Sequence, residues 1–302
     1  MSYLASAGPG RSGEQLAAIG ELELCYETFG DRADPALVLI MGLGTQMVAW
    51  REEFCEGLAA RGFFVVRFDN RDVGRSTWLK QLPVPTVWQL LRRDKRAASY
   101  TLEDMADDVV GLLDHLGIER AHVVGASMGS MIAQTLAVTH PDRVSSLVSI
   151  MGNTGARISG QPTLRTSKAL LGVPPADRDG YVEHMAKTFT LIGSPGFERD
   201  DAELRELART SFDRGRSPAA GARQLAAILA SGDRTKRLRG IAAPTLVIHG
   251  KADKLVRPTG GRATAKAIDG AELLEIPGMG HDLPRDAWPQ IIDAIVANAA
   301  RA

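Results

Sequence analysis

The sequence GASMG occupies residues 125–129, directly after the apolar run AHVV (121–124) and directly before a helical pattern over 128–140. A G-x-S-x-G segment needs this setting, because a strand that turns sharply into a helix presents the central serine at the carboxyl end of a sheet. The glycines two residues before and two residues after Ser127 leave out side chains that would collide at such a corner. The segment therefore predicts a strained turn that exposes the hydroxyl of Ser127.

Outward from this turn, apolar runs alternate with helical patterns. Near-continuous apolar runs are typical of parallel strands that are covered on both faces. The expected strands are 21–29, 36–41, 63–68, 121–124, 144–151, 245–249 and 272–276, and the expected helices are 50–60, 102–116, 128–140, 260–268 and 286–300. The helix over 102–116 has the clearest start, since Thr101 and Asp104 stand at capping-box spacing. This alternation predicts an α/β protein with a doubly wound, mostly parallel sheet.

The alternation stops between residues 153 and 238. Three or four amphipathic helical segments, among them 181–192, 202–214 and 219–230, follow one another there without a strand signal. We therefore expect one α/β body in two parts, residues 21–152 and 239–302, with a helical lid inserted at 153–238.

Ser127 needs a base, because a serine hydroxyl is weakly nucleophilic near neutral pH. His281 is the best placed of the six histidines, since it ends PGMGH (277–281), a glycine-rich loop after the last expected strand. Asp253, in GKAD (250–253), follows the penultimate strand and lies between Ser127 and His281 in chain order, as the acid should. Its rival, Asp282, is adjacent to His281 and poorly placed to reach the ring nitrogen that faces away from Ser127. Ser127, Asp253 and His281 are the predicted catalytic triad.

An acyl-transfer site also needs N–H donors for the oxyanion of the tetrahedral intermediate. The loop after the expected strand 36–41 reads MGLG (41–44), and its glycines allow close backbone approach. We predict that the backbone N–H groups of Leu43 and of Met128, at the start of the helix, form the oxyanion hole.

Composition limits the partners. Lys+Arg and Asp+Glu both number 36 in 302 residues, so no net field attracts nucleic acid or an anionic membrane. Cys25 and Cys55 provide neither a metal-ligand spacing nor a disulfide framework, and no motif implies a metal or an organic cofactor. Residues 1–20 lack the apolar stretch of a signal peptide, and no run of about 18 apolar residues could span a bilayer. We expect a cytoplasmic protein that needs no cofactor; the oligomeric state stays open.

Four motifs in this order resemble the α/β-hydrolase superfamily over residues 21–299, most of all its serine esterase and lipase branch, aclacinomycin methylesterase included. DNRDVGRS (69–76) is similar to the family's Asp-x-Arg-x-x-Gly-x-Ser turn, and IPGMGH (276–281) to its histidine loop. The resemblance implies that Asp69 and Arg71 hold loops near the nucleophile without doing chemistry. Many relatives carry His-Gly where this chain has Met41-Gly42, a change that leaves a backbone donor unaffected.

These features predict a serine hydrolase that cleaves a small-molecule carboxylic ester, with an apolar acyl or alcohol part, through an acyl-enzyme. A serine at the turn disfavours epoxide hydrolases and haloalkane dehalogenases, which use a carboxylate there. A thioesterase, a lactonase, a carbon-carbon bond hydrolase or a cofactor-free peroxidase-like enzyme would keep the same triad, so these alternatives stay open. A non-catalytic ligand-binding protein on the same fold is a more distant alternative.

Overall fold

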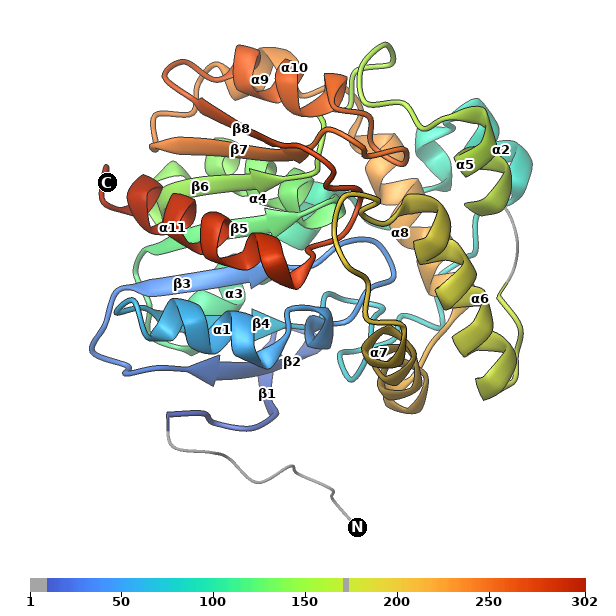
Figure 1. Cartoon of the computed structure of the whole chain (residues 1–302), viewed down its shortest axis with the longest axis horizontal. Coiled ribbons are helices and arrows are strands. Elements are labelled where there is room, and N and C mark those ends of the chain that lie inside the picture. The colour runs from blue at the N-terminus through green and yellow to red at the C-terminus, as the bar shows by residue number, and fades with distance from the viewer. Residues whose placement is uncertain (1–9, 171–173) are drawn as a thin grey trace.

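The computed structural model describes residues 10–170 and 174–302. Eight strands form one sheet in the order β1-β2-β4-β3-β5-β6-β7-β8 (Figure 1). Strand β2 pairs antiparallel with β1 and β4, and all other neighbours pair in parallel. The strands are β1 Gln15–Ile19, β2 Leu22–Phe29, β3 Ala36–Ile40, β4 Phe64–Phe68, β5 Ala121–Ala126, β6 Val144–Ile150, β7 Thr245–Gly250 and β8 Glu272–Ile276. The expected α/β class, with its doubly wound and mostly parallel sheet, is confirmed.

The sheet begins before residue 21, where the sequence places the start of the body. Strand β1 pairs with β2 from Gln15 opposite Tyr26 to Ile19 opposite Leu22. Only Ala17, at its centre, is buried. An edge strand with one buried residue has no apolar run, and the sequence pattern therefore missed it.

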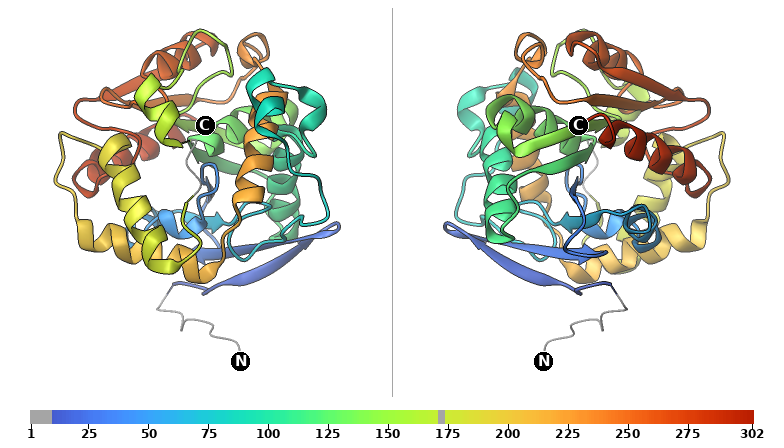
Figure 2. Two further views of the ribbon diagram at one scale, coloured as in Figure 1. Left: turned by 90° about the vertical axis from the view of Figure 1, so that its right-hand side faces the viewer. Right: turned by 90° about the vertical axis from the view of Figure 1, so that its left-hand side faces the viewer.

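Helices cover both faces of the sheet (Figures 1 and 2). One face carries α1 (Glu52–Ala59) and α11 (Trp288–Ala299), and the other carries α3 (Leu102–His115), α4 (Met128–Thr139) and α10 (Thr259–Ala267). Side chains of β3 alternate between the two apolar layers, with Leu37 and Leu39 in one and Val38 and Ile40 in the other. Burial of each such side chain contributes about 1.5–3 kcal/mol. The two layers thereby fix the carboxyl ends of the strands.

Helix α3 starts as its sequence predicts. The side chain of Thr101 accepts hydrogen bonds from the amides of Glu103 and Asp104, and the carboxylate of Asp104 accepts the Thr101 amide at 2.7 Å. This capping box satisfies backbone donors that a helix start leaves without partners.

The insertion between β6 and β7 is helical, and no strand occurs in its described residues, 153–170 and 174–238. Its larger helices gather beyond the carboxyl ends of the parallel strands (Figures 1 and 2). The helices are α5 Leu164–Leu170, α6 Arg178–Ile192, α7 Asp201–Arg214, α8 Pro218–Ser231 and α9 Thr235–Leu238. The short helices α5, α9 and α2 (Val87–Arg92) lie outside the helical ranges given from the sequence. The division into body and insertion, and movement of the insertion as a lid, stay predictions.

Two buried arginines fasten the insertion to the body. Arg223 on α8 donates two hydrogen bonds of 2.8 Å to the carboxylate of Asp72, which also accepts one of 2.9 Å from the hydroxyl of Tyr100. Burial would raise the pKa of Asp72, but the hydrogen bonds that it accepts, above all from Arg223, hold that pKa below its ordinary value. Arg214, at the end of α7, pairs with Asp69 in the same loop after β4. Charged groups therefore connect the insertion to the body out of contact with water.

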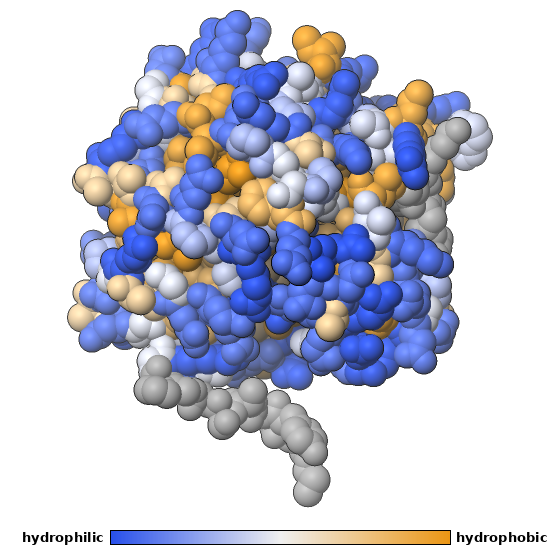
Figure 3. Space-filling model, in the orientation of Figure 1, coloured by the Kyte–Doolittle hydropathy of each residue, from blue (hydrophilic) through white to orange (hydrophobic). Residues whose placement is uncertain are grey.

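The surface seen in Figure 3 is covered mainly by hydrophilic side chains, with apolar side chains scattered between them. Among the described residues, no helix has both the length and the apolar character needed to cross a membrane.

Candidate active site

Ser127 lies at the corner between β5 and α4. Its backbone has φ 56° and ψ −119°, a region that non-glycine residues rarely adopt. Its amide donates to the carbonyl of Ile150 at 2.9 Å. A Cβ on Gly125 would lie 2.2 Å from the carbonyl oxygen of Gly129, and a Cβ on Gly129 would lie 2.0 Å from that of Ile40. The turn is therefore possible only with glycine on both sides of the serine, as the sequence predicts.

The three side chains of the predicted triad lie in one hydrogen-bonded row. Nε2 of His281 is 3.0 Å from Oγ of Ser127, and Nδ1 of His281 is 2.7 Å from Oδ2 of Asp253. Because an ionised carboxylate can only accept, Nδ1 is assigned the proton and Nε2 is left to accept from the serine hydroxyl. His281 is 8% exposed and Asp253 is 3% exposed, so both groups are largely out of water. Such a row can take a proton from a serine hydroxyl.

The loop after β7 holds the carboxylate of Asp253 in place. Its Oδ1 accepts hydrogen bonds from the amides of Leu255 at 2.8 Å and Val256 at 2.9 Å, which leaves Oδ2 for the histidine. Asp282, the rival acid, instead accepts a hydrogen bond from the hydroxyl of Ser194, and burial raises its pKa. The structure thus pairs Asp253 with the imidazole and Asp282 with Ser194.

The histidine loop is held by the turn that follows α6. The amide of His281 donates to the carbonyl of Ile192 at 2.7 Å, and the amide of Gly280 donates to the hydroxyl of Ser194 at 2.8 Å. The helical insertion therefore contributes directly to the position of the imidazole.

The loop after β3 packs against the serine. A Cβ on Gly42 would lie 3.1 Å from Cβ of Ser127, so the absence of a side chain on Gly42 lets the loop lie close to the serine. Within the described residues, neither the amide of Leu43 nor that of Met128 donates a hydrogen bond to the protein. Met128 is the first residue of α4, where a helix has no backbone acceptor to offer. Both predicted donors are left available for an oxyanion.

One buried group beside the row escaped the sequence analysis. Nε2 of His249 is 2.7 Å from the carbonyl oxygen of Val256 and 3.6 Å from Oδ2 of Asp253. Burial lowers the pKa of His249, so the neutral imidazole is favoured. His249 lies near the end of β7, four residues before Asp253. This spacing is the signal in the sequence that could have identified His249 as a neighbour of the acid.

Comparison with known proteins agrees with this fold. The family model described as alpha/beta hydrolase fold matches residues 35–284. The chain belongs to the α/β-hydrolase family. Rhodomycin D methylesterase DauP from Streptomyces sp. (strain C5) is 29% identical, with 93% of this chain and 96% of that protein covered. 3-Oxoadipate enol-lactonase 2 from Acinetobacter baylyi is 28% identical, with coverages of 91% and 94%. The crystal structure of the enol-lactonase from Burkholderia xenovorans LB400 superposes with a TM-score of 0.69 at 25% identity, covering 95% of this chain and 100% of that one.

In this α/β-hydrolase, the turn that resembles the family's Asp-x-Arg segment connects several loops. The carboxylate of Asp69 accepts the amides of Met47 at 2.7 Å and Arg75 at 3.0 Å. Arg71 donates to both carboxylate oxygens of Asp108 on α3, at 2.6 and 2.7 Å. Asp69 therefore contacts neighbouring loops and Arg71 contacts α3. Their role in supporting the site stays a prediction.

Met41, where many relatives carry histidine, is buried in this α/β-hydrolase. Its carbonyl accepts a hydrogen bond of 3.0 Å from the side-chain amide of Asn70, and its side chain joins the layer beneath α1 and α11. The backbone before Gly42 is thereby supported without a histidine.

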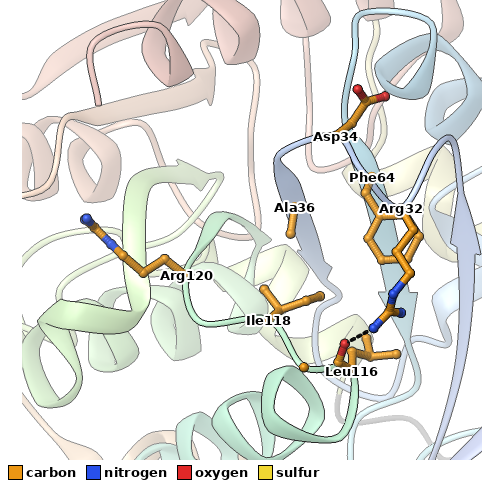
Figure 4. A pocket seen from close by; sticks show the side chains of 8 residues that line it. Arg32, Asp34, Ala36, Phe64, Leu116, Ile118 and Arg120 are labelled. Carbon is orange, nitrogen blue, oxygen red and sulfur yellow. Dashed lines mark hydrogen bonds between the residues drawn. The ribbon is translucent and has the colours of Figure 1, made fainter.

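A surface pocket of this α/β-hydrolase lies at the amino ends of β3 and β4 (Figure 4). Ser127 follows the carboxyl end of β5, at the opposite end of the parallel strands. Ligands of open α/β sheets bind at the carboxyl ends of the strands, which is the end of the sheet where Ser127, Asp253 and His281 lie. The pocket is lined by Arg32, Asp34, Ala36, Phe64, Leu116, Gly117, Ile118 and Arg120. No cluster of three or more metal-ligating His, Cys, Asp or Glu side chains occurs in residues 10–170 and 174–302.

Proposed function

We propose that this chain is a carboxylic ester hydrolase that works through an acyl-enzyme on Ser127. The observation that carries the proposal is the continuous hydrogen-bonded row from Asp253 through His281 to Ser127, at a strained corner beside two free backbone amides. A row of this kind activates a hydroxyl for attack on an acyl carbon.

In the first step, Oγ of Ser127 attacks the acyl carbon of the ester while Nε2 of His281 takes its proton. The amides of Leu43 and Met128 stabilise the negative oxygen of the tetrahedral intermediate. The carbon-oxygen bond to the alcohol then breaks, and the imidazolium returns the proton to the leaving alkoxide. Asp253 stabilises the imidazolium while it exists.

In the second step, water attacks the acyl-enzyme. Nε2 of His281 removes a proton from the water, the bond between the acyl carbon and Oγ breaks, and the serine oxygen regains a proton from the imidazolium. The carboxylic acid leaves and the site is restored without any cofactor in the cycle.

The similarity to rhodomycin D methylesterase supports ester cleavage with a small alcohol as the leaving group. We propose a small-molecule ester with an apolar acyl or alcohol part as the substrate, taken up under the helical insertion.

Similarity to two enol-lactonases makes lactone hydrolysis the second candidate. A lactone is a cyclic ester, so the chemistry at Ser127 is the same, but the alcohol stays attached to the acyl group. The two candidates differ in the shape of the substrate and share the catalytic residues.

Hydrolysis of a p-nitrophenyl ester series from acetate to palmitate, beside a lactone panel, tests the proposal. Wild type should show an optimum of chain length, and the Ser127→Ala variant should lose roughly 10⁶-fold in kcat. Cleavage of lactones alone would select the second candidate. A folded wild type that cleaves neither class would reject both candidates and favour the thioesterase, carbon-carbon bond hydrolase or peroxidase-like alternatives.

Labelling with a fluorophosphonate distinguishes an enzyme from a non-catalytic binding protein. Wild type should be labelled at Ser127, and the Ser127→Ala variant should not, because the reagent needs an activated serine. An unreactive wild type would support a binding role.

A further inference from the structure

The side chain of Gln224, on α8 of the helical insertion, joins two loops of the body. Its Oε1 accepts the amide of Gly44 at 2.7 Å, and its Nε2 donates to the carbonyl of Arg71 at 2.9 Å. Gln224 is 0% exposed, so water does not compete for these bonds.

Gly44 directly follows Leu43. The backbone amide of Leu43 is one of the two amides beside Ser127 that donate no hydrogen bond to the described residues. The loop is a tight turn, in which the amide of Thr45 donates to the carbonyl of Gly42 at 3.2 Å and Gly44 has φ +63°. The hydrogen bond to Gln224 holds the peptide group between Leu43 and Gly44. It therefore limits rotation of the backbone that carries the Leu43 amide.

The same loop contacts the insertion at a second point. The side-chain amide of Gln46 donates to the carbonyls of Ser211 and Gly215 at 2.7 Å each, and its Oε1 accepts from Arg214 at 2.9 Å. Residues 42–46 thus lie between the sheet and the helices α7 and α8.

Helix α8 is itself fixed at the neighbouring residue. Arg223 forms the buried ion pair with Asp72, described above, in the loop that also contains Arg71. The position of Gln224 is therefore set by a contact that does not involve Gly44. A displacement of α8 would move the amide away from Gly44.

We propose that Gln224 is a positioning residue that holds the Leu43 amide where it can stabilise the oxyanion, so that docking of the helical insertion completes the oxyanion hole. This inference rests on the proposed function and adds a role for the insertion in the chemical step. A preorganised donor stabilises the transition state only when its N–H group points at the charge that develops there. Its contribution to the rate is therefore sensitive to its position.

Two substitutions separate this role from simple support of the fold. Gln224→Met keeps the length of the side chain and removes both hydrogen bonds, and Gln224→Glu keeps an acceptor for the Gly44 amide. Gln134→Met is the matched control, since Gln134 is also 0% exposed, donates to the hydroxyl of Ser149 at 3.0 Å and accepts from Arg234 at 3.4 Å. Neither of these hydrogen bonds is to the loop of Gly44 or the loop of Arg71. Gln224→Asn, whose shorter side chain cannot reach Gly44, replaces the Met variant if that protein does not fold.

The readouts are kcat and KM for a p-nitrophenyl ester, the rate of fluorophosphonate labelling of Ser127, and the thermal midpoint. Gln224→Met should lower kcat and the labelling rate by roughly 10- to 10²-fold, less than full loss of a donor, with little change in KM. Gln224→Glu should recover much of the loss, and Gln134→Met should lower the thermal midpoint but keep kcat.

Equal effects of Gln224→Met and Gln134→Met on kcat, or a Glu variant as impaired as the Met variant, would overturn the inference. The labelling rate tests the role of Gln224 without the proposed ester substrate. Phosphonylation of Ser127 also develops negative charge on an oxygen, so it depends on the same amide donors. If wild type is labelled but cleaves no ester, the proposed ester substrate is rejected. The labelling rates of the Gln224 variants then still test the positioning role of Gln224. A wild type that neither labels nor cleaves would reject both.

Discussion

Nε2 of His249 lies 3.6 Å from Oδ2 of Asp253, the same oxygen that accepts the hydrogen bond from His281. A proton added to His249 would place a positive charge next to the carboxylate of Asp253, the acid of the proposed triad. The backbone of Gly261 packs against this ring, since a Cβ there would lie 2.4 Å from Nδ1. His249 is therefore enclosed at the base of the site, where burial lowers its pKa.

The first prediction concerns acid stability. Burial lowers the pKa of His249 below its value in the unfolded chain, about 6.5. Its contribution to stability is then complete above that unfolded value and is lost as the pH falls, because the unfolded state takes up the proton first. The free energy of unfolding of wild type, measured with urea, should fall between pH 7 and pH 5, and that of His249→Gln should fall less. His115→Gln, at an exposed position, is the control and should follow wild type; identical pH profiles for all three proteins would contradict this.

The second prediction separates the two candidate acids. Asp253→Asn should lower kcat by roughly 10⁴-fold, because an amide cannot hold the imidazole in the required tautomer. Asp282→Asn should retain most of the activity, since the Asn oxygen can still accept from Ser194 and the imidazole nitrogens bond to Asp253 and Ser127. Ester hydrolysis by the two purified variants checks this, and an Asp282→Asn protein as inactive as Asp253→Asn would reverse the assignment.

The third prediction concerns glycine at the corner of Ser127. Gly125→Ala should destabilise the fold by more than about 1–3 kcal/mol, the usual cost of overpacking, because its Cβ would meet backbone atoms at 2.2 Å that cannot move independently. Gly221→Ala, within α8, meets no atom within 4 Å and should stabilise by about 0.5–1 kcal/mol through helix propensity. Urea unfolding of both proteins gives the comparison; a Gly125→Ala protein of wild-type stability would show that the corner can relax.

The fourth prediction compares a buried and an exposed ion pair. Arg223→Met leaves the carboxylate of Asp72 buried without its partner and should cost about 3–5 kcal/mol in the free energy of unfolding. Arg237→Met breaks the pair with Glu103, whose side chains are 47% and 52% exposed, and should cost less than about 1 kcal/mol. Equal losses in thermal or urea unfolding would mean that Arg223 does not hold the insertion as described.

Local sequence patterns predicted those elements whose stabilising contacts lie close together in the chain. The spacing of glycines around Ser127 and the capping box of Thr101 and Asp104 are each complete within a few residues. The apolar runs of the inner strands report burial on both faces, which is why those strands were predicted. Strand β1 was missed because an edge strand with only Ala17 buried carries no such signal.

The sequence predicts the members of the triad, because chain order and strand ends restrict where nucleophile, acid and base can stand. Their hydrogen-bonded row, and the direction of Asp282 toward Ser194, depend on how separate loops meet. The contact between Gln224 and Gly44 joins residues 180 positions apart. Periodicity records which face of a helix is buried, but not which distant backbone group a buried amide will meet. That choice is made by the packing of α8 on the body, and only the tertiary structure contains it.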